Sequence, residues 1–104
     1  MSIDTDSTEL IESHRQERLR ELESEEGKAD LEQFLPGTFG CHELLDRTIL
    51  LAEQVERTIL SHPACIQNRQ WYELASEASA ALNELYQRIG SEHLGPDEKD
   101  STSN

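Results

Sequence analysis

The stretch CHELLDRTILLAEQVERTIL, residues 41–60, decides the fold of this chain, because its apolar side chains recur every three or four residues. At about 100° per residue, this spacing places them on one face of an α-helix. The face consists of Cys41, Leu44, Leu45, Thr48, Leu51, Ala52, Val55 and Ile59, widened on one flank by Ile49 and Leu60. It spans more than half a turn of the helix, so we expect it to contact more than one neighbouring helix.

A second stripe of the same spacing lies in WYELASEASAALNELYQRI, residues 71–89. Its members are Trp71, Leu74, Ala75, Ala78, Ala81, Leu82, Leu85 and Ile89, edged by Tyr86. Thr38 and Asn68 are suitable N-caps for the two helices, Pro63 disfavours continuation of the first, and Gly90 suits the C′ position of the second. The sequence therefore predicts an all-α fold, an antiparallel helical hairpin with helices over about 41–61 and 68–90.

An acidic segment precedes the hairpin. Residues 1–32 hold eleven of the 22 acidic residues and four of the nine basic ones, which gives a local net charge of −7. A capping-box pattern from Asp6 to Glu9 predicts a helix over about 7–26, although its apolar stripe is thin. We therefore expect an acidic peripheral helix (1–33), a helical hairpin domain (34–94) and a polar, disordered tail (95–104).

The net charge of −13 limits the partners of the chain. Binding to nucleic acid or to an anionic membrane needs clustered Lys and Arg, so neither is expected. No apolar run approaches the roughly 20 residues that span a bilayer. The first residues, MSIDTDSTEL, lack the basic and apolar regions of a secretory signal, so a cytoplasmic location is expected.

The two cysteines, Cys41 and Cys65, bracket the first predicted helix of the hairpin. If that helix is continuous, a rise of 1.5 Å per residue separates them by about 36 Å. A disulfide needs Cα atoms within about 7 Å of one another, so this pair should stay unbridged.

Residues 41–47, CHELLDR, are the densest group of potential metal ligands. His42 and Asp46 are four residues apart and share one flank of the helix, and an antiparallel hairpin brings His93 to the same end. Their nitrogen and oxygen donors suit zinc or another divalent transition metal, so His42, Asp46 and His93 are the candidate ligands. A hydrogen-bonded His–Asp pair on a solvated surface is the simpler interpretation of the same spacing.

A catalytic interpretation would use Cys41 as nucleophile and His93 as base, because the adjacent His42 points about 100° away from Cys41. A buried cysteine acting as a small apolar residue explains Cys41 more simply. There is no Gly-rich phosphate loop and no Gly-x-Ser-x-Gly motif. The sequence therefore favours a non-catalytic protein without a cofactor.

A lone hairpin of this size buries little apolar surface, and the broad face of residues 41–60 indicates a partner. The sequence thus predicts a non-catalytic helical interaction module that forms a homodimeric bundle. One alternative is a metal-binding or catalytic bundle centred on His42, Asp46 and His93. Another is an acidic decoy or inhibitor whose first helix covers a basic protein partner.

Overall fold

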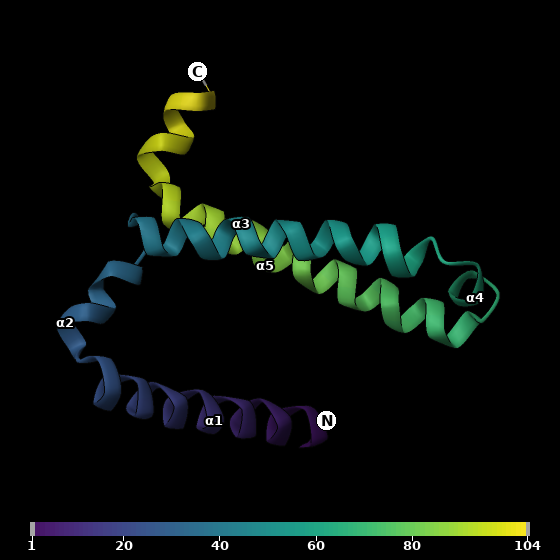
Figure 1. Cartoon of the computed structure of the whole chain (residues 1–104), viewed down its shortest axis with the longest axis horizontal. Coiled ribbons are helices and arrows are strands. Elements are labelled where there is room, and N and C mark those ends of the chain that lie inside the picture. The colour runs from purple at the N-terminus through teal and green to yellow at the C-terminus, as the bar shows by residue number, and fades with distance from the viewer. Residues whose placement is uncertain (1, 104) are drawn as a thin grey trace. The chain divides into compact units, whose positions relative to one another are not determined.

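The computed structural model describes the backbone of residues 2–103 and the side chains of residues 7–95. All regular structure in these residues is helical, as the sequence predicted (Figure 1). The chain divides into two compact units, Met1–Gln33 and Phe34–Asn104.

The first unit contains the helix α1 (Ser2–Glu26) and the short helix α2 (Lys28–Leu31). A 3₁₀ turn, Glu32–Phe34, follows α2. Gly27 separates the two helices with φ of 85°, a left-handed conformation that favours glycine. The helix α1 ends where the sequence predicted, but it begins at Ser2, so Asp6 lies inside the helix rather than capping it.

The second unit is a helical hairpin of α3 (Phe39–Gln54) and α5 (Arg69–Ser103), which pack against each other (Figure 1). The predicted caps are confirmed: the Thr38 hydroxyl accepts from the Cys41 amide at 3.3 Å, and the Asn68 side chain accepts from the Trp71 amide at 3.1 Å. The helices are connected by the π-helical segment η2 (Val55–Leu60) and the short helix α4 (Pro63–Ile66).

The π-helical segment was not predicted. It lies where two hydroxyl groups bond to carbonyls four residues earlier, Thr58 to Gln54 at 2.6 Å and Ser61 to Arg57. Such side-chain bonds compete with the regular backbone ladder of a helix and commonly distort it. The hairpin therefore ends its first helix near Ser61, as predicted, but with a widened last turn.

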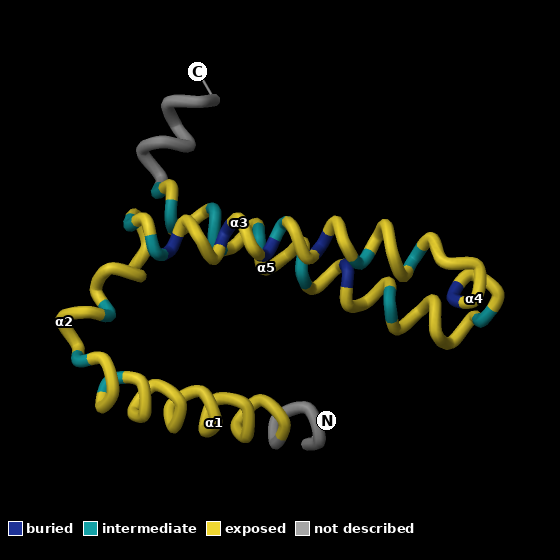
Figure 2. Tube along the Cα trace, in the orientation of Figure 1, coloured by how far each residue is buried: buried dark blue, intermediate teal, exposed yellow. Residues whose placement is uncertain are grey.

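The core of the hairpin is a narrow seam between α3 and α5. Its buried side chains are Cys41, Leu45, Thr48 and Ala52 on α3 and Ser79 on α5, with Cys65 buried at the α4 end (Figure 2). Among the described residues, no large side chain is fully buried. The predicted stripes are therefore only partly covered: Leu44 and Leu51 on α3, and Leu74 and Leu85 on α5, are exposed.

Gly90 does not end the second helix, which corrects the prediction of a C′ position there. It lies inside α5, where a Cβ atom would stand 3.7 Å from Leu45 Cδ1. Regular helical geometry is first interrupted at Gly95, with φ of 80°. The tail predicted to be disordered, 95–104, lies almost wholly beyond the residues whose side chains are described, so that expectation stays a prediction. Within the described part of the chain, no helix is both long and apolar enough to cross a membrane.

Candidate functional site

The open end of the hairpin brings the three predicted metal ligands close to one another. His42 and Asp46 lie on the first two turns of α3, where Thr38 fixes the start of the helix. His93 lies on the part of α5 that returns to the same end, and its ring is 5.4 Å from that of His42, centroid to centroid. The antiparallel topology predicted this meeting correctly.

The contact between His42 and Asp46 is a surface pair. His42 Nε2 is 3.6 Å from Asp46 Oδ2, and the two side chains are 50% and 69% exposed. An exposed pair of this kind contributes little to stability, because both side chains are largely solvated by water. Of the described residues, no three His, Cys, Asp or Glu side chains are grouped so that they could hold a metal ion.

His93 has a role that the sequence did not predict. Its Nδ1 accepts a hydrogen bond from the Gly37 amide at 2.8 Å, which ties the Pro36-Gly37 turn to the end of the hairpin. A neutral imidazole that accepts at Nδ1 carries its proton on Nε2, so neither nitrogen is free to bind a metal in this state. Metal binding by His42, Asp46 and His93 would require His93 to release Gly37, and it stays a prediction.

The cysteines and His62 have structural positions. Cys41 and Cys65 are unbridged, as predicted, and only 7% and 8% exposed. A thiol this buried is poorly placed to attack a substrate. His62 is the N-cap of α4, where its Nδ1 accepts from the Ala64 amide at 3.1 Å.

The two sides of the hairpin differ in chemistry, and this difference provides the second candidate site. On one side is an open hollow with charged walls, lined by Ile49, Ala52, Glu53, Glu56, Arg57 and Asn83. Around α3, Ile49 and Glu53 lie on one side of the seam, and Leu44 and Leu51 lie about 90° from the seam on the other side. Around α5, Asn83 lies on the side of the charged hollow, and Leu74 and Leu85 lie on the opposite side. These leucines therefore project from the other side of the hairpin.

We call that other side the apolar face. Its six large side chains are between 45% and 65% exposed: Leu44, Leu51, Ile59, Trp71, Leu74 and Leu85. A hollow of about 350 Å³ lies at its loop end, lined by Thr58, Ile59, His62, Ala64, Cys65 and Trp71. The periodicity of the sequence predicted a face too broad for one neighbouring helix. It could not show that the uncovered apolar side chains of both helices lie on the same side of the hairpin.

Most acidic side chains of the hairpin lie away from the apolar face, and Glu92, seven residues after Leu85 on the same stripe of α5, is an exception. Glu53 and Glu56 line the hollow on the opposite side, and Glu84 pairs with Arg88 at 2.7 Å. Glu43 and Glu73 pair with Arg47 and Arg69 across one helical turn. Burial of the apolar face would therefore not require burial of these carboxylates.

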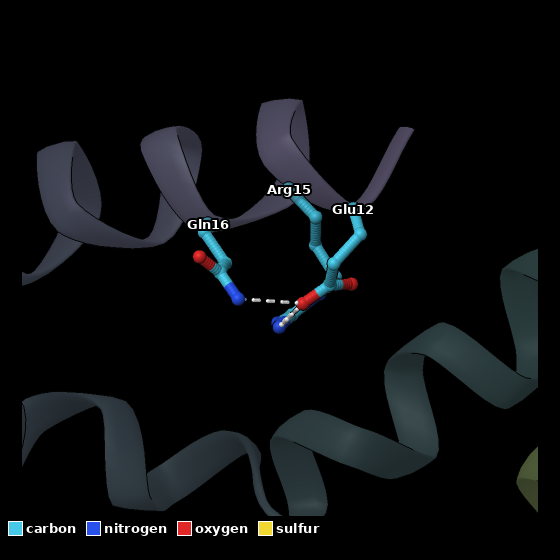
Figure 3. A network of polar contacts seen from close by, with 3 residues as sticks. All are labelled: Glu12, Arg15 and Gln16. Atoms are coloured by element: carbon cyan, nitrogen blue, oxygen red, sulfur yellow. Dashed lines mark hydrogen bonds and ion pairs between the residues drawn. The ribbon is translucent and has the colours of Figure 1, made fainter. Parts of the chain in front are cut away.

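On α1, three residues form a network of hydrogen bonds (Figure 3). The Glu12 carboxylate accepts from Arg15 at 2.6 and 2.8 Å and from Gln16 at 2.9 Å. Hydrogen bonds from Arg15 and then from Gln16 lower the pKa of Glu12 from 4.5 to about 2. All three residues are exposed, so the network supports the helix surface and forms no enclosed site.

Comparison of the chain with protein-family models, with curated proteins and with solved structures finds no match.

Proposed function

We propose that this chain is a non-catalytic helical interaction module that forms a homodimeric bundle through the apolar face of its hairpin. The observation that carries the proposal is the exposure of six large apolar side chains on one side of α3, η2 and α5. Large contiguous apolar patches are uncommon on monomeric proteins, and they typically mark an interaction surface.

Burial of this face would supply the stabilisation that the narrow seam lacks. Full burial of an exposed Leu side chain contributes about 1.5–3 kcal/mol, so covering a leucine of this face, which is already about half covered, contributes roughly half of that. A two-fold dimer uses the same patch on both copies, so each side chain counts twice. Two stacked hairpins then form a four-helix bundle, an arrangement in which short-looped hairpins bury their apolar stripes.

A second copy matches this face better than a basic protein does. The face carries apolar groups, so its best partner is another apolar face of similar size, which the chain itself provides. A basic protein would be attracted instead to carboxylates, such as those of the first unit or of the charged hollow.

Neighbouring leucines on α3 allow a matched test of the proposal. Leu51 lies on the apolar face and is 56% exposed, whereas Leu50 is 55% exposed and points about 100° away. We expect Leu51→Gln to raise the dimer dissociation constant at least tenfold, about 1.4 kcal/mol, because the amide would be buried at the interface. Leu50→Gln should leave the constant unchanged within a factor of about two.

Sedimentation equilibrium over micromolar concentrations measures both constants, and circular dichroism verifies that both variants stay helical. A monomeric wild-type chain would refute the proposal. Equal weakening by both substitutions would show that the chain associates through another surface.

A further inference from the structure

The short helix α4 lies in the connection between the two long helices of the hairpin, and His62 caps its first turn (Figure 1). The Nδ1 atom of His62 accepts a hydrogen bond from the Ala64 amide at 3.1 Å. The backbone of His62 has φ of −75° and ψ of 130°, the extended conformation of an N-cap, which the following Pro63 also favours. The imidazole therefore satisfies an amide that has no carbonyl partner within the helix.

This hydrogen bond requires a neutral imidazole. A neutral ring accepts at one nitrogen and donates at the other, whereas a protonated ring donates at both. Protonation of His62 would place two N–H groups opposite each other where Nδ1 and the Ala64 nitrogen are now 3.1 Å apart. It would also bring a positive charge to the first amides of a helix, which repel cations. Only the neutral form of His62 can therefore cap α4.

The surroundings of His62 offer little to offset a positive charge. Of the side chains that the structure describes, no carboxylate forms an ion pair with this ring. The titratable group that lines the loop-end hollow together with His62 is the Cys65 thiol. The elements packed against α4 are η2 and α5, and their charged side chains near α4 form ion pairs of their own or line the hollow on the opposite side. They are Glu56 and Arg57, which pairs with Glu53, and the pair of Arg69 and Glu73.

Few other hydrogen bonds hold the backbone of α4. The Cys65 and Ile66 amides donate to the His62 carbonyl at 3.0 Å, and the Gln67 amide donates to the Pro63 carbonyl at 3.1 Å. A single turn of helix has little cooperative support, because fixing its first turn costs more than its bonds return. The capping bond is therefore a large part of what keeps this turn closed.

We infer that α4 is a pH-sensitive turn, closed while His62 is neutral and loosened when His62 is protonated. Histidine is the side chain whose charge ordinarily changes between pH 5 and 8. The stabilisation by the cap is present above this range and is lost as the pH falls through it, because protonation removes the acceptor. Loosening would expose Cys65, which is 8% exposed in the closed turn, and open the hollow that Ala64 and Cys65 line. The inference does not depend on the proposed homodimer.

Two substitutions of His62 separate capping from titration, because Asn caps a helix without titrating and Ala provides no acceptor. Amide exchange with water, measured by NMR on the full chain and divided by the intrinsic rate, gives the protection of the Ile66 and Gln67 amides. In the wild type, we expect this protection to fall roughly threefold or more between about pH 7.5 and 5.5, as for the loss of an N-cap. It should stay high at both pH values in His62→Asn and be low at both in His62→Ala.

His14→Asn is the matched control, because it removes an imidazole from α1, in the other unit of the chain. This variant should respond to pH as the wild type does. In the wild type itself, the chemical shift of the Ala64 amide nitrogen should follow the protonation of the His62 ring. Equal loosening of α4 in acid in His62→Asn and in the wild type would overturn the inference, as would an Ala64 shift that does not follow His62.

Discussion

At the scale of single residues, the Glu12 carboxylate illustrates how an exposed group acquires an unusual pKa. Its two oxygens accept from the Arg15 guanidinium and from the Gln16 amide one turn further on. These bonds favour the ionised form and lower the pKa to about 2. Because the pKa in the folded state lies below the ordinary value of 4.5, the network stabilises α1 above pH 4.5, and this contribution is lost as the pH falls from 4.5 towards 2.

We expect Arg15→Met to return the pKa of Glu12 most of the way to 4.5, because it removes the donor that makes the largest contribution. Arg18→Met is the control, since it removes the same charge from α1 without removing a donor to Glu12. Titration of the Glu12 side-chain carbonyl carbon by NMR measures the pKa. Equal shifts in both variants would mean that net charge, and not the hydrogen bond, sets the value.

At the scale of elements, helix ends were predictable where a side chain caps the backbone. Thr38 and Asn68 are recognisable because their short polar side chains accept from amides three residues later. Gly90 misled the prediction, because glycine suits both a helix end and a close contact, and here it lies beside Leu45 in the seam. The π-helical segment depends on hydroxyl bonds that periodicity does not reveal.

The two kinds of glycine in the hairpin should respond oppositely to alanine. Gly90→Ala should stabilise the hairpin by roughly 0.5–1 kcal/mol, because alanine favours the helix and its Cβ would meet Leu45 at an ordinary contact distance. Gly37→Ala should destabilise it by roughly 1–2 kcal/mol, because φ at Gly37 is 89°. Urea unfolding at one fixed protein concentration measures both. Destabilisation by Gly90→Ala would mean that the seam at Leu45 has no room for a methyl group.

At the scale of the whole molecule, the proximity of His42 and His93 followed from topology alone, since an antiparallel hairpin brings its two free ends close together. The hydrogen bond between Gly37 and His93 could not be predicted in this way, because its donor is a backbone amide and the pattern of side chains does not reveal it. The side of the hairpin that stays apolar was equally hidden. Periodicity places Leu44 and Leu51 beside the seam, but only the position of α5 determines that they are left uncovered.

Native mass spectrometry of the purified protein tests subunit number and metal together. We expect twice the mass of the 11.8 kDa chain without an added ion, because His93 uses Nδ1 to accept from Gly37. His42→Ala should give the same mass per subunit apart from the substitution itself. One zinc ion per chain in the wild type, lost in His42→Ala, would replace the interaction module by the metal-binding alternative.

The hydrogen bond between Gly37 and His93 also has a consequence for folding. It joins residues 56 positions apart, and closing a flexible loop of that length costs about 3.6 kcal/mol in chain entropy, before any constant. One hydrogen bond returns only about 0.5–1.5 kcal/mol. The bond therefore cannot form in the unfolded chain. It forms only after α3 and α5 have packed together, starting from the α4 turn. The Gly37 amide therefore reports whether the hairpin is completely formed, because fraying from the open end breaks this bond first.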